Sequence, residues 1–206
     1  MMFSHLREDF PTLRGDNAPT YLDNACVTLK PDSVINSISD YYSMYPGCGG
    51  RSVHRYGTQV SRLVSDARNS IAKFINANSV SEVVFTRNAT HSINQIAKGM
   101  KWEEGDVVIT GDREHNSNLV PWLQLVEEKG IEHRIVESNA DNTFNVGKFE
   151  QLCEEVGDRL KMVSLSHVGN LDGVSIPIKK IAKITHEYDA LMSVDGAQST
   201  PHMRVD

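Results

Sequence analysis

The chain has 206 residues, of which 39% are hydrophobic, and this length and composition are typical of a folded domain rather than a disordered segment. The 21 Lys and Arg residues are scattered and outnumbered by 27 Asp and Glu residues, for a net charge of −6. This balance disfavours binding to a nucleic acid. No window approaches the about 18 to 20 consecutive apolar residues of a membrane span, and residues 1–10 carry charges where a signal peptide would be apolar. We therefore predict a cytoplasmic protein with no membrane partner.

The cysteines and histidines give no pattern of a metal site. Cys26, Cys48 and Cys153 are widely spaced, without a C-x-x-C pair, so neither a disulfide framework nor a thiolate zinc site is indicated. The eight histidines show no ligand spacing and no H-E-x-x-H motif. We predict reduced thiols and no bound metal.

The first third of the chain reads as two helices joined by a loop. After an extended segment at residues 21–23, Pro31 and the apolar pattern that follows it predict a helix that ends before Pro46. Residues 46–57 contain four glycines among polar and basic residues and are predicted to form a loop. A long amphipathic helix is predicted over residues 58–77.

From Glu82 onward, short apolar runs alternate with amphipathic segments. Helical patterns lie near residues 90–100, 119–129, 148–156 and 178–188. The predicted strands recur about every 24 to 29 residues and are Val83–Phe85, Val107–Ile109, Arg134–Val136, Met162–Leu165 and Leu191–Val194. This alternation is typical of βαβ units and predicts an α/β fold with a mostly parallel sheet and helices on both faces.

Polar clusters follow four of these strands, at the positions where parallel sheets bind ligands. They are residues 86–91, 111–115, 166–170 and 195–198. Each cluster alone is more readily explained by helix caps and turns. Because the carboxyl ends of parallel strands share one edge, we expect the clusters to lie together.

The residue types in these clusters suit one cofactor. The helix start at Ala89 and Thr90 offers free N–H groups and a hydroxyl to a phosphate. Asp195 is placed to pair with a protonated ring nitrogen, as pyridoxal 5′-phosphate (PLP) requires. His115 could stack on a planar ring and carry protons, and Asn170 and Gln198 could hydrogen-bond a phenolic oxygen. Dinucleotide-binding and P-loop motifs are absent.

Taken together, these segments resemble the class V aminotransferase family of PLP enzymes, and most closely its cysteine desulfurase and selenocysteine lyase branch. The resemblance runs in family order from Tyr21 to Asp206. The segments that carry it are Tyr21-Leu22-Asp23-Asn24-Ala25, Val53-His54-Arg55, Phe85-Thr86-Arg87-Asn88-Ala89-Thr90, Glu114-His115 with Asn118 and Val120-Pro121-Trp122, His167-Val168-Gly169-Asn170, and Val194-Asp195-Gly196-Ala197-Gln198.

The resemblance implies a role for each matching position. It implies a fold type I PLP-dependent transferase domain, with the ring stacked by His115, which also transfers protons. It assigns the phosphate to Ala89 and Thr90, the phenolic oxygen to Asn170 and Gln198, and the ring nitrogen to Asp195. Ala25 and His54 match the amino-acid substrate pocket, although His54 is equally compatible with a solvated loop residue. Cys26 is interpreted as a small buried residue rather than a persulfide carrier.

Four departures from the family pattern stand out. His91 replaces a glutamate that many relatives carry, and Ala89 lacks a hydroxyl that some supply. The Ser-x-His-Lys stretch, whose lysine forms the Schiff base, lies beyond Asp206 in the family pattern, and the ten lysines present read as surface or turn positions. The small C-terminal domain, with its arginine and sulfur-accepting cysteine, is missing too.

We therefore expect an N-terminal segment over residues 1–20 and an incomplete PLP-binding large domain over residues 21–206. The resemblance implies conversion of L-cysteine to L-alanine and an enzyme-bound persulfide, a homodimeric complete form, a sulfur-acceptor protein, and a place in sulfur metabolism and iron–sulfur cluster assembly. The chain alone is expected to be inactive. The alternatives are another class V enzyme acting on a different amino acid, or a non-catalytic cofactor-binding or interaction module.

Overall fold

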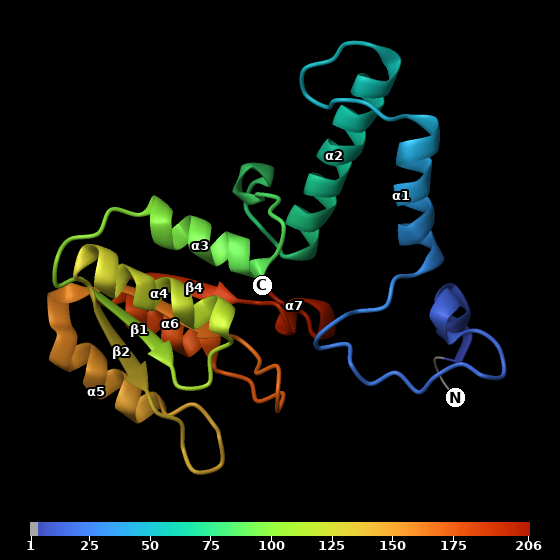
Figure 1. Cartoon of the computed structure of the whole chain (residues 1–206). Helices are drawn as coiled ribbons and strands as arrows, with labels where there is room; N and C mark the ends of the chain where they lie inside the picture. The colour runs from blue at the N-terminus through green and yellow to red at the C-terminus, as the bar shows by residue number, and fades with distance from the viewer. Residues whose placement is uncertain (1–3) are drawn as a thin grey trace. The chain divides into compact units, whose positions relative to one another are not determined.

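The computed structural model describes residues 4–206, which form two compact units, described separately below (Figure 1). The N-terminal unit ends at Val83, and the C-terminal unit runs from Val84 to Asp206. The expected boundaries, a segment over residues 1–20 and one domain over residues 21–206, stay a prediction. None of the helices in the described residues is long and apolar enough to cross a lipid bilayer.

The N-terminal unit contains the two predicted helices. They are α1 (Asp32–Met44) and α2 (Arg55–Phe74), accompanied by 3-10 turns at Ser4–Asp9, Pro11–Leu13 and Val80–Glu82. α2 begins three residues earlier than predicted because His54 caps it, Nδ1 accepting a hydrogen bond from the Gly57 N–H at 3.4 Å. It ends before the predicted Ala77 because Asn76 takes a left-handed φ of 54°.

The loop between these helices is packed against the start of α2. The Gly50 N–H donates to the Ser61 hydroxyl at 2.8 Å. A Cβ at Gly57 would lie 2.5 Å from the Ser52 Cβ, so the close approach of the loop requires a glycine there. Cys26, which we expected to be buried, is exposed in this unit.

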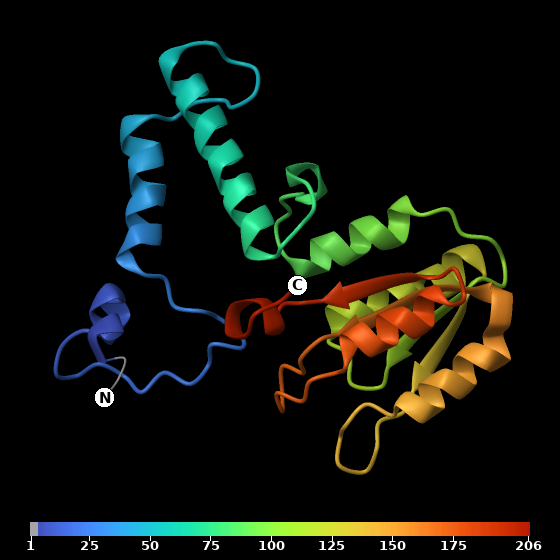
Figure 2. The same ribbon diagram turned by 180° about the vertical axis from the view of Figure 1, so that it is seen from behind.

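The C-terminal unit is built on a four-stranded sheet in which all strands are parallel, in the order β2-β1-β3-β4 (Figures 1 and 2). The strands are β1 (Val107–Gly111), β2 (Glu132–Val136), β3 (Leu160–Ser166) and β4 (Leu191–Asp195). The helices are α3 (Ala89–Gly99), α4 (Asn116–Lys129), α5 (Val146–Val156), α6 (Ile178–His186) and the short α7 (Ser199–His202), with a 3-10 turn at Gly157–Arg159. The predicted α/β fold is confirmed.

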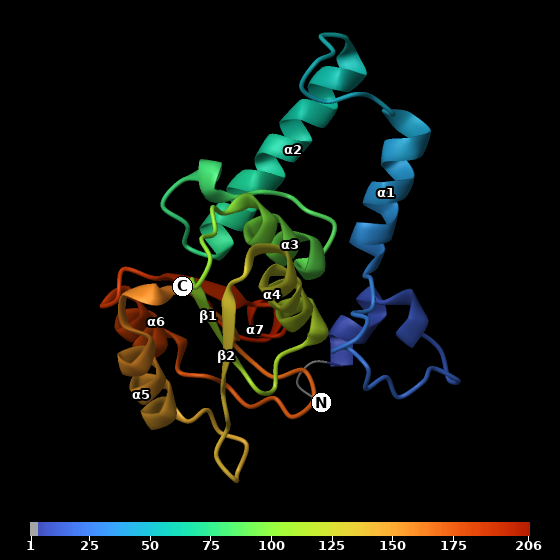
Figure 3. The same ribbon diagram turned by 60° about the vertical axis from the view of Figure 1, so that its left-hand side comes forward.

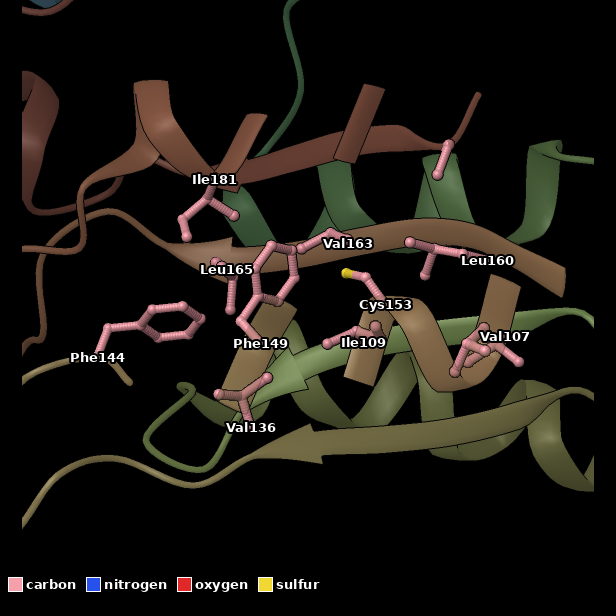
Figure 4. Packing of buried hydrophobic residues seen from close by; sticks show 12 residues of the cluster. Val107, Ile109, Val136, Phe144, Phe149, Cys153, Leu160, Val163, Leu165 and Ile181 are labelled. Atoms are coloured by element: carbon pink, nitrogen blue, oxygen red, sulfur yellow. The ribbon is translucent and has the colours of Figure 1, made fainter. Parts of the chain in front are cut away.

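Helices cover both faces of this sheet, α5 and α6 on one and α3 and α4 on the other (Figure 3). The alternation of side chains along β1 divides the core: Ile109 faces α5 and α6, whereas Val108 faces α3 and α4. Figure 4 shows Phe149 and Cys153 of α5 packed over the first face beside Ile109. The continuous burial of β1 explains why its sequence is a run of apolar residues.

The predicted strand at Val83–Phe85 is wrong. The Val83 N–H bonds back to the Val80 carbonyl, and the Val83 carbonyl accepts from Arg68 Nε at 3.1 Å, so both backbone groups are used outside a strand ladder. Val84 and Phe85 are exposed, and within residues 4–206 no strand pairs with this segment. β-branched side chains favour an extended chain, but a strand requires a neighbour to hydrogen-bond.

Truncation of one methyl group distinguishes the buried strand β1 from the edge strand β2. Ile109→Val should lower the free energy of unfolding by about 1 kcal/mol, because Ile109 is fully buried. The matched control Ile135→Val, at a side chain that is 49% exposed, should change it by less than about 0.5 kcal/mol. Urea unfolding followed by tryptophan fluorescence reports this unit alone, since both tryptophans, Trp102 and Trp122, lie in it. Equal losses for the two variants would contradict the burial pattern.

Candidate functional site

The order of the strands creates a crevice at the carboxyl ends of β1 and β3. β1 is followed by β2 on one side and neighboured by β3 on the other, and the connecting helices leave to opposite faces. Open α/β sheets bind ligands at such a point. A cleft of about 370 Å³ lies here. Its lining residues are Asp112, Arg113, Glu114, His115, Asn116, Gly169, Asn170, Leu171 and Asp172.

His115 and Asn170, predicted from separate clusters, therefore meet in one cleft. His115 is the N-cap of α4, and its Nδ1 accepts a hydrogen bond from the Ser117 N–H at 3.1 Å. A nitrogen that accepts from a backbone N–H carries no proton, so the neutral ring holds its proton on Nε2. Asn170 is exposed in the turn that follows β3.

Thr90 joins this group through a hydroxyl contact. Its Oγ1 lies 2.7 Å from Ser117 Oγ, which in turn lies 2.9 Å from His115 Nδ1. The contact connects the N-terminus of α3 to that of α4, so the first N–H groups of both helices lie close to each other. Those groups have no acceptor within their helix, and Ala89 and Thr90 belong to them. Two adjacent helix N-termini with hydroxyls form a suitable phosphate cradle.

Glu114 is a half-buried residue in the lining of the cleft, and it was quoted from the sequence only as part of a motif. Its Oε2 accepts from the Ser166 N–H at 2.8 Å, the Ser166 hydroxyl at 2.7 Å and Asn118 Nδ2 at 2.7 Å. Asn118 Oδ1 accepts from the Ser164 hydroxyl at 2.5 Å. The network fastens the end of β1 to the end of β3. Burial raises the pKa of Glu114 above the usual range of a glutamate, against the lowering effect of the Asn118 and Ser166 hydrogen bonds.

Asp195 lies at the end of β4, the strand beside β3. The carboxylate is buried, and Oδ1 accepts from the Ala197 N–H at 3.0 Å. The Asp195 carbonyl accepts from the His167 N–H at 3.0 Å, which ties the end of β4 to the segment that carries Asn170. Gln198 follows as the residue preceding α7. The four predicted clusters thus lie along one edge of the sheet.

The predicted substrate residues Ala25 and His54 both belong to the N-terminal unit, where both are exposed. The His54 ring is occupied in capping α2, as described above. Their role in binding the substrate stays a prediction.

The cysteines of the chain differ in exposure. Cys26 and Cys48 are exposed, whereas Cys153 is buried on the side of α5 that faces the core. Burial raises the pKa of the Cys153 thiol to about 12, which keeps it protonated at neutral pH. Cys153 is therefore a structural residue, because a thiol reacts as the thiolate.

The raised pKa of Glu114 predicts a pH dependence of stability. A carboxyl that is harder to ionise in the folded state binds more protons there than in the unfolded state. The free energy of unfolding of the wild type relative to Glu114→Gln should therefore fall as pH rises from the pKa of Glu114 in the unfolded state to its pKa in the folded state. The slope is limited to about 1.4 kcal/mol per pH unit.

Glu132→Gln is the matched control with the opposite sign. Hydrogen bonding to Arg159, with the nearby charges of Arg134 and Arg159, lowers the pKa of Glu132, so its contribution is present above the unfolded pKa and is lost as pH falls through the folded one. Urea unfolding between about pH 4 and 7.5, read by tryptophan fluorescence, measures both differences. If the stability of the wild type relative to Glu114→Gln rose with pH instead, the hydrogen bonds to Glu114 would outweigh the effect of its burial on the pKa.

The chain is similar to proteins of one known family. The chain matches the "Aminotransferase class-V" family model over residues 20–206. It is 38% identical over 189 residues to a probable cysteine desulfurase of Halalkalibacterium halodurans, covering 90% of this chain and 46% of the relative. It is 35% identical over 206 residues to a probable cysteine desulfurase of Methanothermobacter thermautotrophicus, covering 100% of this chain and 50% of the relative.

Solved structures agree with these relatives. The apo cysteine desulfurase of Thermococcus onnurineus superposes with a TM-score of 0.89 at 30% identity, covering 98% of this chain and 49% of that one. The Escherichia coli cysteine desulfurase CsdA gives a TM-score of 0.85 at 29% identity, covering 98% and 50%. The chain thus spans about half the length of the proteins it matches. It belongs to the class V aminotransferase family.

Proposed function

We propose that this chain is the cofactor-binding part of a PLP-dependent cysteine desulfurase, which converts L-cysteine to L-alanine and an enzyme-bound persulfide. The observation that carries the proposal is the cleft between the ends of β1 and β3, where His115 and Asn170 meet beside the hydroxyl-linked starts of α3 and α4. The relatives named probable cysteine desulfurase support L-cysteine as the substrate. A cytoplasmic location, a homodimeric complete form, a sulfur-acceptor partner and a place in iron–sulfur cluster assembly stay expectations of the resemblance.

The residues at the carboxyl-terminal edge of the sheet, which we call the rim of the cleft, fit PLP in charge and polarity. The N–H groups of Ala89 and Thr90 and the hydroxyls of Thr90 and Ser117 suit a phosphate dianion. Asp195 supplies a buried carboxylate, the partner that a protonated pyridine nitrogen needs in a site shielded from water. Asn170 and Gln198 offer amide groups for the phenolic oxygen.

PLP, when bound, supplies the electron sink for chemistry at the amino-acid α-carbon. In our proposal His115 holds a proton on Nε2, because Ser117 occupies Nδ1, and lies against the pyridine ring. Asp195 keeps the ring nitrogen protonated through its negative charge. Glu114 keeps the ends of β1 and β3 together, so that His115 and Asn170 keep their spacing.

Asp195 and Thr90 should have separable effects on PLP binding. Thr90→Ala should raise the Kd for PLP by roughly 5- to 150-fold, since one hydrogen bond to a charged phosphate contributes about 1 to 3 kcal/mol. Asp195→Ala should instead lower the pKa of the ring nitrogen by about one unit or more, read from the absorption spectrum of bound PLP against pH. Thr143→Ala, which removes a hydroxyl bonded to Asp141 in another loop, should change neither quantity.

An unchanged ring-nitrogen pKa in Asp195→Ala would contradict the assignment of Asp195. It would then be left with its bond to the Ala197 N–H, as a residue that closes the turn after β4. An equal loss of affinity in Thr143→Ala would contradict the phosphate assignment, because that loop makes no part of the proposed cradle.

The 206-residue chain by itself should not turn over L-cysteine. None of its lysines lines the cleft, and those with ion pairs, such as Lys148 and Lys180, bond surface carboxylates. A solvated lysine keeps a pKa near about 10.4 and is a poor nucleophile. We expect no alanine from L-cysteine beyond that produced by free PLP, and, after incubation with PLP and borohydride, no lysine labelled in preference to the other exposed lysines.

The complete cysteine desulfurase of Thermococcus onnurineus is the positive control for this assay. Peptide mass mapping that found a pyridoxyl group on one defined lysine of the chain would overturn the prediction and identify the missed nucleophile.

A further inference from the structure

The turn that carries Asn170 is closed by its own backbone. The Gly169 N–H donates to the Val174 carbonyl at 2.9 Å, and the Gly173 N–H donates to the Gly169 carbonyl at 3.0 Å. Gly173 takes a left-handed φ of 71° to make this possible. Leu171, at the tip, is 87% exposed, so apolar burial does not hold the turn in place.

Asp172 holds this turn from inside. Its Oδ1 accepts from the Val174 N–H at 3.0 Å. A Cβ on Gly169 would lie 2.5 Å from this same oxygen, so the inward position of Asp172 depends on the glycine. Its Oδ2 accepts from Arg113 Nη2 at 2.5 Å.

Arg113 connects that turn to a further loop. While Nη2 binds Asp172, Nη1 donates to Asn142 Oδ1 at 3.1 Å, in the loop between β2 and α5. Arg113 itself follows β1, so its guanidinium links the segments that follow β1, β2 and β3. A planar guanidinium can serve two acceptors at fixed angles, which a lysine ammonium does less well. The Arg113 and Asp172 side chains are 40% and 24% exposed, so solvent only partly screens the pair.

We propose that Arg113 is a positioning residue that sets the place of Asn170 in the cleft. Within residues 4–206 no hydrogen bond holds the Asn170 side chain directly, so the turn determines its position. Asp172 is the residue of this turn whose side chain bonds to another segment, through Arg113. The inference rests on the proposed function in one respect, namely that the ligand of Asn170 is PLP.

The test compares Arg113→Gln with the matched control Arg134→Gln. Arg134 is 44% exposed and pairs with Glu132 on β2, away from the cleft. Hydrogen exchange, followed by NMR, measures the amides of Gly169, Gly173 and Val174, and PLP titration measures the Kd. In Arg113→Gln we expect these amides to exchange about 5-fold faster and the Kd for PLP to rise by a similar factor, because the turn loses its bond to Arg113. Neither should change in Arg134→Gln.

Two further variants separate positioning from general destabilisation. Arg113→Lys should restore part of the protection, because it keeps the charge beside Asp172 but loses the bond to Asn142. Adding Asp172→Asn to Arg113→Gln should raise the Kd for PLP no further than Arg113→Gln does, because the bond between Arg113 and Asp172 is already lost in Arg113→Gln.

The exchange rates and the Kd for PLP test different parts of the proposal. Unchanged exchange in the turn would overturn the positioning role, and faster exchange with an unchanged Kd would show that the turn does not place Asn170 against the ligand. If the wild-type chain showed no saturable PLP binding, the proposed function would fail, while the exchange data would still decide whether Arg113 holds the turn.

Discussion

The carboxylate of Glu114 is the contact on which the site depends. It crosses from the end of β1 to the end of β3 and accepts three hydrogen bonds there, two from Ser166 and one from Asn118. A charged group in a largely buried position is costly unless donors surround it, and here the donors come from β3 and α4. The connections that follow β1 and β3 diverge at this point, and Glu114 holds the two strand ends together.

The segment after β1 connects to a different neighbour at each residue. Asp112 accepts from the Ser138 N–H and hydroxyl, Arg113 reaches Asn142 and Asp172, and His115 caps α4. The bonds of Asp112 and Arg113 join loops that are far apart in sequence, so the rim of the cleft is held by polar contacts rather than by the apolar core beneath it. This division leaves polar groups available to a ligand while the sheet supplies rigidity.

Much of this arrangement was predictable because its signals are local. The apolar run of β1 follows from burial and the helix start at Ala89 from capping, and parallel pairing then brings His115 and Asn170 to one edge. The start of α4 at Asn116 lies three residues before the predicted residue 119, because His115 caps the helix. The strand at Val83–Phe85 was predicted wrongly, since propensity says nothing about whether a partner strand is present. Glu114 and Arg113 were missed as site residues because their partners, Ser166 and Asp172, lie more than fifty residues away in sequence.

The most direct test of the central claim, that the crevice between β1 and β3 is a PLP site in this chain, is an NMR titration of the labelled protein with PLP, with pyridoxal as the control lacking a phosphate. We predict saturable shifts of the amides of Ala89, Thr90, Ser117 and Asn170, with the changes at Ala89, Thr90 and Ser117 much weaker for pyridoxal. Shifts confined to lysine-bearing surfaces such as that of α6, equal for both compounds, would contradict the account.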